Sequence, residues 1–102
     1  MLPEYFLLES NADSLNSIAQ EFSSLKENHI VIKLSDNLNI SEEILSLFLD
    51  KAKALKKNGM SFVVVKTGID VDDFSEELNI VPTLQEAEDV LEMEAIERDL
   101  GF

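Results

Sequence analysis

Five closely spaced carboxylates are the residues of this 102-residue chain with the most obvious capacity to hold a metal ion. They are Asp70, Asp72, Asp73, Glu76 and Glu77. Calcium prefers several carboxylate oxygens, but the EF-hand loop also requires a glycine at its sixth position and a glutamate at its twelfth. Counted from Asp70, those positions hold Ser75 and Val81. We therefore interpret the segment as solvated charge and expect no metal site.

Side chains that could perform catalysis are scarce elsewhere. The chain has no cysteine, which excludes thiolate metal sites and cysteine nucleophiles, and its one histidine, His29, cannot build a multi-histidine site. A nucleophile beside a base, or a glycine-rich loop for phosphates, would indicate an enzyme, and the sequence shows neither pattern. We expect a protein that is not an enzyme and uses no cofactor.

A polar turn followed by a capped helix is the strongest local pattern in the chain. Residues 35–37 carry side chains that hydrogen-bond nearby backbone and so favour a turn. The next helix begins either at Asn39, with Glu42 completing a capping box, or at Ser41, which is a good N-cap by itself. Glutamates near the start of this helix and lysines near its end complement its dipole.

The hydrophobic pattern predicts the elements around this turn. Apolar runs indicate strands, two of them buried on both faces, and apolar residues at helical spacing indicate amphipathic helices. The predicted strands are at residues 5–9, 30–34, 61–66 and 78–81. The apolar stripes of the predicted helices cover residues 15–25, 44–55 and 84–100. The order βαβαβ, then a loop or short helix, then β and α, predicts an α/β fold with a small, mostly parallel sheet of about four strands.

Acidic residues accumulate toward the C-terminal end of the chain. The net charge is -13, and residues 70–102 hold twelve acidic side chains against Arg98 alone. Nucleic-acid binding depends on Lys and Arg that neutralise phosphates, so we expect no nucleic-acid partner. The length fits one domain, residues 1–102, with residues 92–102 as an acidic helical extension. A thin apolar stripe on this extension either contacts a partner or belongs to a solvated helix: Met93, Ile96, Leu100 and Phe102.

Membrane association is not indicated by the sequence. No apolar run approaches the ~20 residues that a membrane-spanning helix needs. The first residues, MLPEYFLLES, lack the basic flank and the length of a secretion signal. We therefore expect a cytoplasmic protein with no membrane partner.

Four sequence segments carry a family resemblance, which covers about residues 5–91. They are IVIKLS, the helix that begins at Ser41, LKKNGMSFVVV and VPTLQEA. Their order and spacing resemble the STAS domain, the family of the anti-sigma factor antagonists. The resemblance implies a STAS-like fold and a non-catalytic regulatory or protein-binding role. It also implies a protein partner, such as an anti-sigma factor or another regulator.

The same resemblance implies a binding surface at the turn of residues 35–43. The implied contact residues are Ser35, Asp36, Asn37, Asn39, Ser41, Glu42 and Glu43. Counted without gaps from Leu34, the serine that anti-sigma factor antagonists phosphorylate corresponds to Glu42, which either imitates a phosphate or contributes to the helix cap. If the register shifts by one residue, Ser41 becomes the candidate phosphoacceptor, and the helix N-terminus would stabilise the phosphate.

The last ten residues support an alternative function. MEAIERDLGF is similar to the end of small acidic proteins that bear the name ribonuclease Z. That nuclease family requires a His-x-His-x-Asp-His metal motif, and this sequence lacks it, so the similarity implies no nuclease activity. The alternative function is therefore an accessory partner of an enzyme, bound through the acidic C-terminal helix. The oligomeric state is left open.

Overall fold

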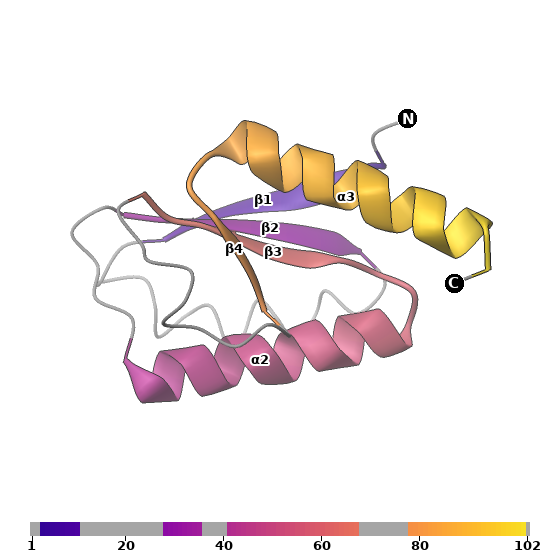
Figure 1. The fold of residues 1–102 in the computed structure, drawn as a ribbon. Helices are drawn as coiled ribbons and strands as arrows, with labels where there is room; N and C mark the ends of the chain where they lie inside the picture. Colours follow the sequence, from indigo (N-terminus) through magenta and orange to yellow (C-terminus); the bar gives the residue numbers. More distant parts are fainter. Residues whose placement is uncertain (1–2, 11–27, 36–40, 68–77, 102) are drawn as a thin grey trace.

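Four parallel strands and two long helices make up the described part of the chain (Figure 1). The computed structural model describes residues 3–10, 28–35, 41–67 and 78–101. Its elements are β1 (Tyr5–Ser10), β2 (His29–Leu34), α2 (Glu42–Lys57), β3 (Phe62–Val65), β4 (Asn79–Val81) and α3 (Leu84–Asp99). The helix predicted around residues 15–25 lies outside the described residues.

The strands pair in the order β1-β2-β3-β4, and every pair is parallel. Ile32 lies opposite Val64 in the register of β2 and β3, and Val64 lies opposite Ile80 in the register of β3 and β4. Helices α2 and α3 cover opposite faces of this sheet (Figure 1). The predicted α/β fold with a small parallel sheet of four strands is therefore confirmed.

The face of the sheet toward α2 holds the larger apolar cluster. Alternate residues of a strand point to opposite faces, so β2 divides its apolar side chains between two layers. The buried members of the cluster are Ile30, Ile32, Leu34, Phe48, Leu55, Phe62, Val64, Leu78 and Ile80. The rings of Phe48 and Phe62 make a tilted contact with centroids 5.9 Å apart, which fixes the middle of α2 against β3.

The opposite face packs against α3. Its buried members are Val31, Val63, Val65, Ala87 and Leu91. Because β2 and β3 are covered on both faces, they require the nearly unbroken apolar sequence that they have. The Tyr5 hydroxyl donates to Glu88 Oε2 at 3.2 Å and so links β1 to α3. Burial, followed by the charge of Glu88 and this hydrogen bond, raises the pKa of Tyr5.

Both helices have well-formed ends. Thr83 Oγ1 accepts a hydrogen bond from the Glu86 backbone N–H at 3.2 Å, which confirms the predicted cap of α3. After α2, Gly59 adopts a φ of +78°, and the Met60 N–H donates to the Leu55 carbonyl at 2.8 Å. This is the Schellman pattern, and it turns the chain directly into β3. Neither described helix is long and apolar enough to cross a membrane.

Candidate functional site

The described part of the predicted binding surface comprises Ser35, at the carboxyl end of β2, and Ser41, Glu42 and Glu43, at the start of α2 (Figure 1). Open parallel sheets commonly bind ligands at this edge, because their loops converge there. Ser35 follows β2 directly and is half-buried, whereas Ser41, Glu42 and Glu43 are exposed. The other implied contact residues lie outside the described residues: Asp36, Asn37 and Asn39.

Ser41 is the N-cap of α2. Its Oγ accepts a hydrogen bond from the Ile44 N–H at 3.3 Å, and its carbonyl accepts the first helical bond from the Leu45 N–H at 2.9 Å. Of the two predicted helix starts, the one at Ser41 is confirmed. Glu42 and Glu43 occupy the first turn, where negative charge is favoured by the helix dipole. The turn therefore presents a hydroxyl and two carboxylates on the end of a fixed helix.

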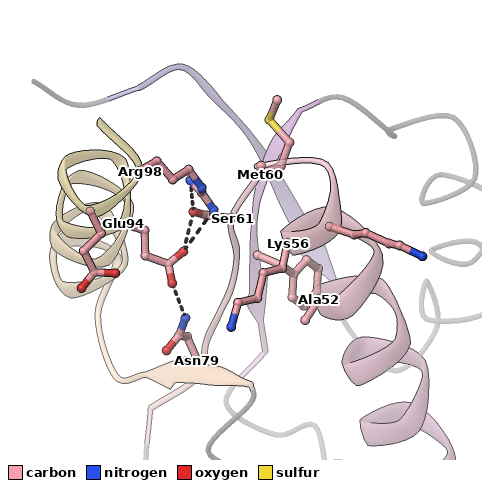
Figure 2. A pocket seen from close by; sticks show the side chains of 11 residues that line it. Ala52, Lys56, Met60, Ser61, Asn79, Glu94 and Arg98 are labelled. Carbon is pink, nitrogen blue, oxygen red and sulfur yellow. Dashed lines mark hydrogen bonds and ion pairs between the residues drawn. The ribbon is translucent and has the colours of Figure 1, made fainter. Parts of the chain in front are cut away.

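A second polar cluster lies at the other edge of the sheet, where β3 and β4 begin (Figure 2). The Ser61 hydroxyl donates to Glu94 Oε1 at 2.5 Å and accepts from Arg98 Nη1 at 3.1 Å. Asn79 Nδ2 donates to the other carboxylate oxygen of Glu94 at 3.2 Å. Arg98 also pairs with Glu94 at 3.8 Å along the helix. These bonds fasten the second half of α3 to the amino ends of β3 and β4.

His29 joins this cluster from the start of β2. Its Nδ1 accepts a hydrogen bond from the Ser61 backbone N–H at 2.9 Å, so the folded state requires an imidazole without a proton on that nitrogen. Burial lowers the pKa of His29, and the nearby positive charge of Arg98 lowers it further, while Glu94 acts in the opposite direction. The neutral form of His29 is therefore the one that fits this edge of the sheet.

A pocket of about 450 Å³ opens beside the cluster, between the last turns of α2 and α3. Lys56 and Lys57 line its α2 side, and Glu97 and Arg98 line its α3 side. In Figure 2, Lys56 lies across the pocket from Glu94 and Asn79. The wall thus carries both signs of charge, and its most buried polar group, Ser61, is already bonded inside the cluster.

The hydrogen bonds of the cluster around Ser61 have a structural role. A serine nucleophile needs a base at its hydroxyl and access for a substrate. Here Ser61 is only 1% exposed. Its hydroxyl donates to the Glu94 carboxylate, which also binds Asn79 and Arg98. His29 binds the backbone of Ser61 and not its hydroxyl. The arrangement satisfies buried polar groups and joins three strands to α3.

This cluster is not predictable from the sequence alone. Its members come from β2, β4, α3 and the residue before β3, so no local spacing brings them together. Glutamates on an acidic helix are ordinarily solvated, and no sequence pattern distinguishes Glu94 from the other acidic residues of this helix. One signal was present: Arg98 is the only base after residue 69, and it lies four residues after Glu94.

The acidic segment considered for calcium lies outside the described residues. Asp70, Asp72, Asp73, Glu76 and Glu77 all belong to it. Among residues 3–10, 28–35, 41–67 and 78–101, no group of three potential ligands (His, Cys, Asp or Glu) is arranged to hold a metal ion.

The stripe predicted on the C-terminal helix is only partly described. Met93, Ile96 and Leu100 are all exposed, whereas Phe102 lies outside the described residues. Residues 92–99 continue α3 without interruption, and Glu94 and Arg98 in this half bond to Ser61. The second half of the helix is thus attached to the sheet by polar contacts, while its apolar residues point away.

Comparisons with known proteins give no relative for this chain. No protein-family model matches it, no curated protein matches it, and no solved structure matches it. The STAS resemblance and the similarity of the last ten residues to ribonuclease Z proteins therefore stay predictions.

Proposed function

We propose that this chain is a non-catalytic, cytoplasmic module that binds another protein through the turn of residues 35–43. One observation carries the proposal: Ser41, Glu42 and Glu43 are all exposed at the first turn of α2, although the same helix buries Phe48 and Leu55 in the core. The scaffold is fixed, and these polar groups project from it at the carboxyl edge of a parallel sheet. Exposed polar groups on a rigid scaffold are well suited to recognition.

The chemistry of the turn indicates what a partner would supply. Glu42 and Glu43 offer two negative charges, which favour Arg or Lys on the partner. The Ser41 hydroxyl remains able to donate a hydrogen bond while it accepts from Ile44. A regulator of the anti-sigma factor type is the partner that the STAS resemblance suggests. Neither a nucleic acid nor a membrane is part of the proposal.

Phosphorylation of Ser41 is a regulatory extension of this proposal. The N-terminus of a 16-residue helix favours an added phosphate, because its first N–H groups have no helical partners. The adjacent carboxylates of Glu42 and Glu43 oppose the added charge. A phosphate here would therefore change the charge that a partner meets more than it would stabilise the helix.

The test is a quantitative pull-down from a native lysate with three baits. The baits are the wild-type chain, Glu42→Ala with Glu43→Ala, and a control with Glu4→Ala and Asp50→Ala. The control removes the same charge at two exposed residues away from the turn. We expect a protein that the wild type and the control capture equally and that the turn variant captures at least about tenfold less, which corresponds to about 1.4 kcal/mol of binding free energy.

Two results would argue against this surface. If all three baits recover the same partner in equal amounts, the partner binds elsewhere. If the turn variant and the control lose it equally, net charge and not the turn determines binding. Circular dichroism of each bait verifies that the fold is retained.

The second candidate, an accessory partner of an enzyme that binds through the acidic C-terminal helix, is favoured by a separate observation. Met93, Ile96 and Leu100 remain exposed on α3 although the opposite side of this helix is packed on the sheet. In this case binding would survive the changes at Glu42 and Glu43 and would depend on the helix.

A further inference from the structure

The outward side of α3 carries a continuous apolar stripe. Met93, Ile96 and Leu100 are 58%, 53% and 66% exposed, and their spacing of three and four residues places them on one line along the helix. Ala87 and Leu91, which are fully buried, lie on the side that faces the sheet. Among the described elements, none packs against the stripe.

Acidic side chains border this stripe along both sides. Glu92 and Asp99 flank one side of it and Glu97 flanks the other, and all three are at least partly exposed. Glu86 and Asp89 lie in line with the stripe toward the start of α3 and are exposed. The single base of the helix, Arg98, is directed away from them, since its guanidinium bonds to Ser61 and pairs with Glu94. The outward face of α3 is therefore apolar along its centre and negative along its edges.

The stripe is presented by a helix that is held in place. Leu91 and Ala87 anchor its first half in the core, and the bonds of Glu94 to Ser61 and Asn79 anchor its second half. A partner that binds here does not have to order the helix, which removes one of the costs of association.

We propose that the outward stripe of α3 docks an amphipathic helix of a partner protein whose apolar face is bordered by Lys and Arg. Apolar residues repeating every three and four positions match the ridges of a second helix. The acidic borders favour a partner of positive charge. A second copy of this chain is the poorer occupant, because pairing α3 with α3 would bring two sets of acidic borders together. This inference does not depend on the turn of residues 35–43.

The test uses two designed helical peptides as probes against the full chain. One has a leucine face bordered by Lys and Arg, and the other has the same leucine face bordered by Glu. Binding is measured by fluorescence anisotropy at low and high salt. The variants are a stripe variant (Met93→Gln, Ile96→Gln, Leu100→Gln), a border variant (Glu97→Gln, Asp99→Asn), and a control of equal charge change (Glu4→Gln, Asp50→Asn).

We expect saturable binding of the basic peptide to the wild type, with an affinity that falls as salt rises. The stripe variant should raise the Kd by about tenfold or more, the border variant by about threefold, and the control by less than about twofold. Glutamine is a good helix former, so α3 should persist in the stripe variant, and circular dichroism verifies this.

Four results would overturn the proposal. The first is no saturable binding of the basic peptide by the wild type up to about 1 mM, which is weaker than about 4 kcal/mol of binding free energy. The second is equal affinity of the stripe variant and the wild type. The third is equal affinity for the basic and acidic peptides. The fourth is a wild-type dimer in sedimentation that the stripe variant lacks, which would assign the stripe to a second copy of the chain.

Discussion

The imidazole of His29 links the start of β2 to Ser61, the residue before β3. It accepts the backbone N–H of Ser61 at the first residue of β2, and it lies close enough to Arg98 and Glu94 for both to affect its titration. The hydrogen bond is available only while Nδ1 is unprotonated. A proton on this ring would remove the acceptor and place a second positive charge near Arg98.

This contact predicts a pH dependence of stability. Burial and Arg98 lower the pKa of His29, so the folded state binds fewer protons than the unfolded chain near the ordinary histidine pKa of 6.5. The stabilisation is present above the unfolded pKa and is lost as pH falls through the folded value. Between about pH 7.5 and about pH 5.5, the wild type should therefore lose more unfolding free energy than His29→Asn, whose amide oxygen can accept the same N–H at either pH.

Urea denaturation at the two pH values measures this difference. The variant provides the control for the many carboxylates, because their titration is common to both proteins. Equal losses in the wild type and in His29→Asn would show that His29 does not contribute.

At the level of secondary structure, Gly59 determines where α2 ends and the chain turns into β3. Its φ of +78° lies in the left-handed region, and a Cβ built there would meet no atom within 4 Å. The cost of a side chain at this position is consequently a backbone cost and not a clash. Gly101 closes α3 with a similar φ of +82°, but it lies at the exposed end of the described chain, where a last turn can unwind without disturbing the core.

Substitution at these two glycines should therefore have unequal effects. Gly59→Ala should lower the free energy of unfolding by about 1 to 2 kcal/mol, the ordinary cost of a left-handed L-residue, and Gly59→Asn by less. Gly101→Ala should cost less than about 0.5 kcal/mol, as expected of an exposed position away from the core. Urea denaturation of the three variants measures this order. A neutral Gly59→Ala, or an equal cost at Gly101, would contradict the assigned role.

At the scale of elements, the sequence was sufficient for much of the fold. The runs that became β2 and β3 are apolar on both faces because α2 and α3 cover them, so their pattern leaves little alternative to a central parallel strand. The caps at Ser41 and Thr83 were readable because a short polar side chain precedes each helix. The turn predicted at residues 35–37 lies mostly outside the described residues, and the binding role of residues 35–43 rests on a resemblance.

The polar cluster could not be predicted because it exists only when several elements meet. Ser61 and Asn79 are short polar residues next to strand starts, and Glu94 is one of many glutamates, so none is distinctive by itself. Their bonds depend on the packing of Leu91 and Ala87, which sets the position of α3 over the sheet. Hydrophobic spacing predicts that packing, but it does not identify which polar side chains will meet beside it.

For the molecule as a whole, the proposed function assigns different roles to the amino ends and the carboxyl ends of the strands. At the amino ends of the strands, Ser61 bonds to both His29 and Glu94, and the bond to Glu94 fastens α3. At the carboxyl edge, Ser41 to Glu43 remain exposed at the start of α2. The described bonds at the amino ends of the strands fasten α3, and in the proposed function the exposed start of α2 serves recognition.

Hydrogen exchange of the wild-type chain, measured by mass spectrometry with and without the partner recovered by pull-down, tests whether residues 35–43 are the binding surface. Amides that a partner covers, or whose local opening it suppresses, exchange more slowly. We expect slower exchange in peptides that cover residues 35–47 when the complex is saturated. A saturated complex in which residues 35–47 exchange at the free rate would contradict this expectation.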